Sequence, residues 1–174
     1  MTDKGLMIWD PVLRLLHWVT ACCFVLNYWV LEQGGFWHRF VGYLLFFMVM
    51  VRLIWGFTGP KNARFSLCIL QKTSWQQHFS QLKGRHLHAH EGHNPFGFLW
   101  LYASLALFAA LATTGFLLEE VDYFFGSDRL EFIHGTLADT LFAGVCIHVL
   151  AVFLVQWWGK ISLIKPMFTG KRRF

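Results

Sequence analysis

Charged residues are scarce in this sequence. Only 14% of its 174 residues are Asp, Glu, Lys or Arg, whereas 56% are hydrophobic and 18% are aromatic. Soluble domains carry about 25% charged residues, so this composition indicates a chain that lies in membrane lipid. In a soluble protein a formal net charge of +5 would suggest a nucleic-acid partner, which is not expected here. In a membrane protein the basic residues instead indicate which side of the membrane each segment occupies.

Cysteine motifs are also lacking. The four cysteines form no C-x-x-C, no C-x-x-C-H and no disulfide-like spacing, so the sequence indicates neither haem c attachment nor a zinc knuckle. We expect all four to be small apolar filler. A cleavable signal peptide is not expected either, because Asp10 and Arg14 are followed by bulky sequence without a small-residue cleavage site.

Four apolar runs are long enough to cross a bilayer, whose core of ~30 Å needs about 20 helical residues. The predicted spans are about 11–31, 36–57, 96–118 and 132–158. Asp10-Pro11 and Asn94-Pro95 each supply an N-cap followed by a proline at the first helical position. The sequence therefore predicts an all-α, four-helix membrane bundle in which residues 1–174 form one domain.

Basic residues are concentrated on one side of this predicted bundle. Four spans return the chain to its starting side, so both termini share a side with the long loop 58–95. Of the 15 Lys and Arg residues, all but Arg39 and Arg129 belong to this side. Cytoplasmic segments of membrane proteins are rich in Lys and Arg, so the termini and the loop are predicted to be cytoplasmic. The opposite side carries Glu32, Glu119, Glu120, Asp122, Asp128 and Glu131.

The loop 58–95 contains a short amphipathic pattern. Trp75, Phe79 and Leu82 recur at i, i+4 and i+7 between polar residues. This spacing favours a short helix on the membrane surface, with an ordinary loop as the alternative.

Two histidines lie in the fourth predicted span. At 1.5 Å and about 100° per residue, His134 and His148 are roughly 21 Å apart along the helix axis but only about 40° apart around it. Ionisable groups inside a membrane are costly, which makes them candidates for function. His17 in the first span and His38 in the second fall at the depths of His148 and His134, because successive spans run in opposite directions.

Two facing imidazoles at each of two depths are what two six-coordinate haems require. Zinc would need four close ligands, and a proton relay would need carboxylates along its path, whereas Asp139 is the only acidic residue well inside a span. We therefore predict that His17 and His148 ligate one haem iron and that His38 and His134 ligate the other. The alternative is a set of hydrogen-bonded structural histidines.

Haem propionates need cations nearby. Arg14 precedes His17 by three residues on the same helix face, and Arg52 lies deep in the second span, so both are candidates for the cytoplasmic haem. Arg39 and Arg129 are the candidates for the outer haem. Each arginine could instead extend towards lipid phosphates.

Six stretches form a recognisable set. They are WDPVLRLLHW (9–18), HRFVGY (38–43), VRLIWGFTGPKNARFS (51–66), GHNPFG (92–97), HGTLADTLFAGVCIH (134–148) and MFTGKR (167–172). Through them the chain resembles the bacterial cytochrome b561 family, whose relatives include the cytochrome b subunits of nickel–iron hydrogenases. The resemblance implies a four-helix cytochrome of the bacterial inner membrane with two haems b, which exchanges electrons with the quinone pool. It also implies the same four histidines as axial ligands.

The stretch RHLHAHEGHNP departs from the usual short lead into GHNP. His86, His88 and His90 could hold a metal ion or bind metal only adventitiously. His93 is a candidate to donate to a haem propionate or a quinone carbonyl, or it could be a simple helix-entry residue.

Three functions remain open from the sequence. The first is electron transfer between membrane quinone and a periplasmic partner, such as a cytochrome c or a dehydrogenase or hydrogenase subunit, since bis-histidine ligation leaves no open position on iron. The acidic outer face would attract a basic partner.

The second function is superoxide oxidation coupled to quinone reduction, as in some short relatives. An anionic substrate would favour a positive funnel, but only Arg39 and Arg129 are available outside. The third, a non-redox scaffold or transporter, leaves the histidine pairs unexplained. Small residues between Ala103 and Gly115 would permit close helix contacts, including those of a homodimer.

Overall fold

The computed structural model describes residues 6–84 and 94–172, and four of its helices are long and apolar enough to cross a membrane. They are α1 (Pro11–Val25, continued by a π-helical segment Leu26–Val30), α2 (Phe36–Thr58), α4 (Pro95–Glu120) and α5 (Asp128–Gly159). The predicted all-α class with four spans is therefore confirmed.

The helix α5 begins at Asp128, four residues before the predicted start of the fourth span. Its first turn contains Asp128 and Glu131. Acidic residues lower the hydropathy of a segment, so the predicted span started after them. Negative side chains are favourable at a helix N-terminus because of the helix dipole. The helix thus extends beyond its apolar part.

The remaining elements are short. They are the 3₁₀ turns Leu67–Leu70 and Asp122–Phe124, the helices α3 (Lys72–Lys83) and α6 (Ile164–Thr169), and the strands β1 (Leu6–Met7) and β2 (Lys171–Arg172). The two strands pair antiparallel, with Leu6 opposite Arg172 and Met7 opposite Lys171. Segments close to the two ends of the chain therefore lie side by side.

The chain divides into two compact units. Unit one comprises Met1–Leu15, Ile54–Leu101 and Cys146–Phe174, and unit two comprises Leu16–Leu53 and Tyr102–Val145. The long helices pass through both units, so each unit contains a part of α1, α2, α4 and α5.

Unit one is organised around the start of α1. Ile8, Trp9, Leu13 and Ala63 form a buried cluster there. The Asp10 carboxylate accepts hydrogen bonds from Leu13 N at 3.0 Å and from Trp55 Nε1 at 3.2 Å, so it caps α1 and fixes the end of α2. Asn94 Oδ1 caps α4 by accepting from Gly97 N at 2.7 Å. Both predicted N-caps are confirmed.

The helix α3 confirms the helical pattern predicted in the long loop. Its apolar face meets the first turn of α4, where Trp75 and Phe79 lie with ring centroids 4.8 Å and 6.0 Å from that of Phe96. His78 is buried beside the same ring, with centroids 5.5 Å apart. Part of the apolar face that was predicted to lie on the membrane surface therefore packs against α4, although Phe79 stays half exposed.

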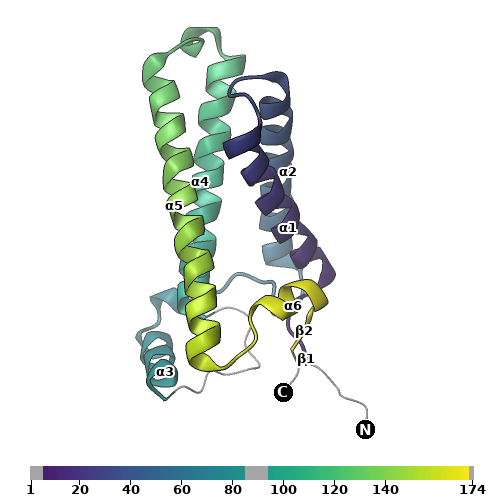
Figure 1. The fold of residues 1–174 in the computed structure, drawn as a ribbon, viewed down its shortest axis with the longest axis vertical. Coiled ribbons are helices and arrows are strands. Elements are labelled where there is room, and N and C mark those ends of the chain that lie inside the picture. Colours follow the sequence, from purple (N-terminus) through teal and green to yellow (C-terminus); the bar gives the residue numbers. More distant parts are fainter. Residues whose placement is uncertain (1–5, 85–93, 173–174) are drawn as a thin grey trace. The chain divides into compact units, whose positions relative to one another are not determined.

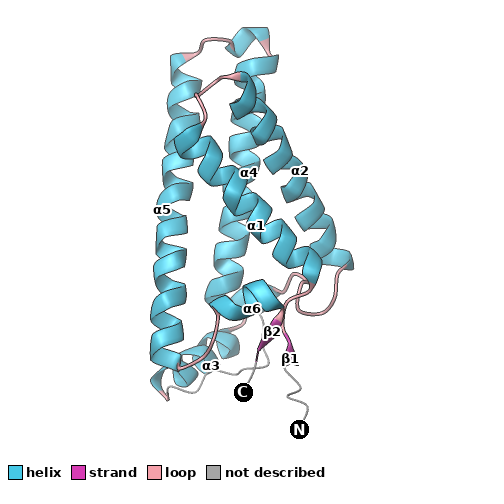
Figure 2. Cartoon of the chain, turned by 45° about the vertical axis from the view of Figure 1, so that its right-hand side comes forward, coloured by secondary structure: helices cyan, strands magenta, loops and turns pink. Residues whose placement is uncertain are grey.

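Unit two contains parts of the four long helices, which run side by side there (Figure 1 and Figure 2). Phe24 of α1 contacts Phe108 of α4 with ring centroids 6.0 Å apart. Asn27 Nδ2 donates to the His38 carbonyl of α2 at 3.2 Å. Short connections join α1 to α2 and α4 to α5, so the two helices of each pair run antiparallel. In this unit His38 of α2 lies beside His134 of α5.

Candidate functional site

The predicted outer pair, His38 of α2 and His134 of α5, is brought together within unit two. Their ring centroids are 6.3 Å apart, and the ring planes are inclined at 65°. His134 is half-buried between helices, and the Nδ1 atom of His38 is buried without a hydrogen-bond partner in the described part of the chain. Buried polar atoms normally have a hydrogen-bond partner, so a bound ligand is one explanation for this ring nitrogen.

The separation of the two rings agrees with that of two axial ligands on one iron. Nitrogen–metal bonds of about 2 Å on either side of a metal, plus roughly 1.1 Å from each nitrogen to its ring centre given ring bonds of about 1.33 Å, would place two opposed ring centroids about 6.2 Å apart. Over residues 6–84 and 94–172, no cluster of three or more His, Cys, Asp or Glu side chains could hold a metal ion. Two imidazoles are the donor set that haem would require of the protein, because its macrocycle supplies the other four nitrogens.

Helix α4 contributes to this site although it carries no histidine. The hydroxyl of Thr114 lies 2.8 Å from His134 Nδ1. The neighbouring Gly115 faces the same ring, since a Cβ added there would lie 3.3 Å from His134 Cε1. From the sequence, this stretch was expected only to permit close helix contacts. A Thr-Gly pair at the depth of a predicted ligand is the sequence signal that indicates this role.

The predicted inner pair is divided between the two units. In unit one, the His148 ring stacks on Trp100 of α4, with centroids 5.8 Å apart and planes inclined at 17°. In unit two, the His17 ring meets the edge of Trp18 at 5.2 Å. The pairing of His17 with His148 stays a prediction.

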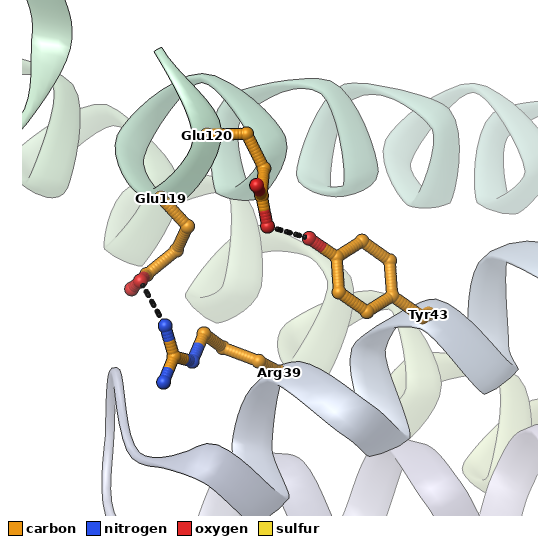
Figure 3. Close-up of polar contacts among 4 residues, drawn as sticks. All are labelled: Arg39, Tyr43, Glu119 and Glu120. Carbon is orange, nitrogen blue, oxygen red and sulfur yellow. Dashed lines mark hydrogen bonds and ion pairs between the residues drawn. The ribbon is translucent and has the colours of Figure 1, made fainter. Parts of the chain in front are cut away.

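The end of unit two near the connections from α1 to α2 and from α4 to α5, which is the predicted outer end, carries a group of charged and polar contacts (Figure 3). Arg39, the residue after His38, forms an ion pair with Glu119 at 2.9 Å. Tyr43 donates its hydroxyl proton to Glu120 at 2.6 Å. One carboxylate of α4 therefore offsets the positive charge of Arg39, and the next carboxylate along α4 accepts from Tyr43. Arg129 is exposed in the first turn of α5.

The two arginines predicted for the inner haem occupy different surroundings. Arg14 donates from Nη1 to the carbonyl of Phe168, at the C-terminal end of α6. Arg52 is buried in α2 with only 8% of its surface exposed. A role at haem propionates stays a prediction for both, as it does for Arg39 and Arg129. His86, His88, His90 and His93 lie outside the described residues.

Asp139, the acidic residue inside the fourth span, has a partner that sequence reasoning missed. Tyr28, in the π-helical segment after α1, donates to Asp139 Oδ1 at 2.7 Å. The Tyr28 ring stacks on Phe142 of α5, with centroids 4.7 Å apart. A carboxyl group in an apolar span is costly unless it is hydrogen-bonded. The pair therefore joins the π-helical segment after α1 to α5 and gives the carboxylate of Asp139 a hydrogen-bond donor within the apolar span.

Replacing Tyr28 with Phe should lower the stability of the protein, because it removes the donor and leaves Asp139 unsatisfied. The expected cost is about 0.5–1.5 kcal/mol, the usual net contribution of one hydrogen bond, seen as a lower Tm in mild detergent. Tyr123→Phe is the matched control, since Tyr123 is 87% exposed, and its Tm should not change. Equal Tm values for the two variants would show that the contact contributes nothing.

Comparison with known proteins agrees with the sequence pattern. Residues 8–170 match the family model described as prokaryotic cytochrome b561, a region that includes all four predicted ligands. No curated protein and no solved structure matches the chain.

Proposed function

Since the chain belongs to the prokaryotic cytochrome b561 family and is therefore a membrane cytochrome of the b type, we propose that it holds two haems b and carries electrons across the bacterial inner membrane. One partner is the quinone pool, and the other is a periplasmic redox protein such as a cytochrome c or a dehydrogenase or hydrogenase subunit. The observation that carries this proposal is the pair of His38 and His134, whose 6.3 Å centroid separation agrees with axial ligation of one iron.

The four histidines would be shared between the two haems, two to each. His38 and His134 would hold the outer haem, and His17 and His148 the inner one. When bound, each haem supplies a one-electron couple. With two histidines as its ligands, each iron would have no open position for oxygen or another substrate. This favours electron transfer over chemistry at the metal.

Charged side chains would assist at both membrane surfaces. Arg14, Arg52 and His93 are the candidates for contacts with the inner haem's propionates, and His93 also for a quinone carbonyl. Arg39 and Arg129 are the candidates at the outer haem. The paired strands β1 and β2 support an arrangement with both termini on one side, and the excess of Lys and Arg there favours the cytoplasm.

The outer surface favours a basic protein over an anionic substrate. Arg39 is paired with Glu119, and Glu120, the next residue of α4, accepts a hydrogen bond from Tyr43. A positive funnel is what would attract superoxide, and these carboxylates oppose one. The same charges would steer a basic redox protein towards the outer haem. Superoxide:quinone oxidoreduction is therefore the less favoured alternative.

The test begins with the full chain purified in mild detergent. Pyridine haemochrome quantitation and oxidised and dithionite-reduced spectra should give two low-spin haems b per chain. In proteoliposomes, a quinol should then reduce external cytochrome c at a rate that falls with rising salt, because steering by charge is screened. Absence of haem would overturn the proposal. Quinone reduction by superoxide without cytochrome c reduction would overturn the choice of partner.

A further inference from the structure

The contact between Thr114 and His134 carries a consequence for the outer haem. We propose that Thr114 is a positioning residue: its hydroxyl oxygen accepts the Nδ1 proton of His134, which leaves Nε2 as the iron-binding nitrogen and lowers the midpoint potential of the outer haem. This inference rests on the proposed function, in which His134 is an axial ligand.

The direction of the hydrogen bond follows from the surroundings of the hydroxyl. Thr114 Oγ1 lies 2.9 Å from the carbonyl of Ala110 and 3.1 Å from that of Leu111. A hydroxyl has one proton to donate and two lone pairs to accept with. Carbonyl oxygens can only accept, so they take the Thr114 proton. At 2.8 Å from His134 Nδ1, the Thr114 oxygen is therefore the acceptor.

The protonation of the imidazole follows from this direction. A neutral imidazole carries its proton on one nitrogen and a lone pair on the other. With Nδ1–H donated to Thr114, the lone pair of His134 is on Nε2. Histidines that bind metals commonly donate their second ring nitrogen in this way, and the contact fixes both the tautomer and the orientation of the ring.

The same contact affects the stability of the two oxidation states of iron. Donation from Nδ1–H makes the imidazole a more basic ligand. A more basic ligand favours ferric over ferrous iron, because the ferric ion has the higher charge. The hydrogen bond lies inside a membrane span, where water does not compete for the donor. We therefore expect its removal to raise the potential of the outer haem only.

The test compares two neighbouring threonines in the full, haem-loaded protein. Thr114→Val removes the acceptor and keeps the branched shape. Thr113→Val is the matched control, because the Thr113 hydroxyl is exposed and donates to its own helix, to Ala109 O at 2.9 Å. The midpoint potentials of both haems are measured by spectroelectrochemical titration, and the ferric ligand fields by electron paramagnetic resonance.

The potential of the outer haem should rise in Thr114→Val by the equivalent of a threefold to tenfold change in its redox equilibrium, which is about 28–59 mV for one electron. The inner haem, Thr113→Val and the conservative variant Thr114→Ser should keep wild-type potentials. If Thr114 acted only through packing, Thr114→Val would change the haem content or the Tm without raising the potential of the outer haem alone. If Thr114→Val loads no outer haem, Thr114→Ala provides the same comparison.

Two failures are distinguishable. Unshifted potentials in the Val or Ala variant, with both haems present, would overturn the role of Thr114 and leave ligation by His134 intact. Retention of both haems in His134→Ala would overturn the proposed function itself.

Discussion

Alanine at His38 or His134 should remove one of the two haems and leave the other. Each substitution would take away one predicted axial ligand of the proposed outer haem, since the rings of His38 and His134 lie with their centroids 6.3 Å apart. A five-coordinate iron in an apolar span is bound more weakly, so we expect purified variants with about one haem b per chain. Pyridine haemochrome quantitation gives the count, and the redox titration should then show a single component.

Alanine at His17 or His148 should remove the other haem. The component that remains should match the one lost in the His38 and His134 variants. His78→Ala is the control, because His78 is a buried histidine of α3 outside the spans, and it should keep both haems. The pairing would be wrong if the His17 and His38 variants lost the same component.

A large side chain at Gly115 should abolish the outer haem. Even a Cβ at this position would lie 3.3 Å from His134 Cε1 and 3.8 Å from Nδ1, so the ring would have to move. Gly115→Ala should shift the spectrum of the outer haem, and Gly115→Leu should reduce the content to about one haem per chain. Alanine favours a helix by about 1 kcal/mol relative to glycine, so weakening of α4 does not account for such a loss.

Gly135 of α5 offers a matched control for Gly115 of α4. It follows His134 in α5, and a Cβ there would have no neighbour within 4 Å. Gly135→Ala should therefore keep two haems with unchanged spectra. If Gly115→Leu also kept both haems, the approach of α4 to the His134 ring would not matter for binding.

These two predictions address different parts of one site. The histidine variants test which side chains bind iron, whereas the Gly115 variants test whether α4 must lie close to the ring. The two histidines of α5 also differ in what α4 presents to them. His134 meets a hydroxyl and a glycine, and His148 meets the indole of Trp100. The two haems are therefore expected to differ in potential.

The sequence by itself determined the local features of this protein. The length of an apolar run and the residues at a helix start act within one segment, so four spans and the caps at Asp10 and Asn94 could be predicted. The fourteen-residue spacing of His134 and His148 fixed which face of α5 carries them, because helix geometry is regular. The start of α5 at Asp128 was missed because hydropathy responds to lipid, whereas a helix N-terminus tolerates acids.

Contacts between helices were decided only by the tertiary structure. Thr114 and His134 are 20 positions apart, Arg39 and Glu119 are 80 apart, and Tyr28 and Asp139 are 111 apart. Each contact depends on the rotation and depth of two helices together, which the periodicity of either helix leaves open. The predicted ligand His134 could be found from its own helix, but its partners on α4 required the packing of that helix against it.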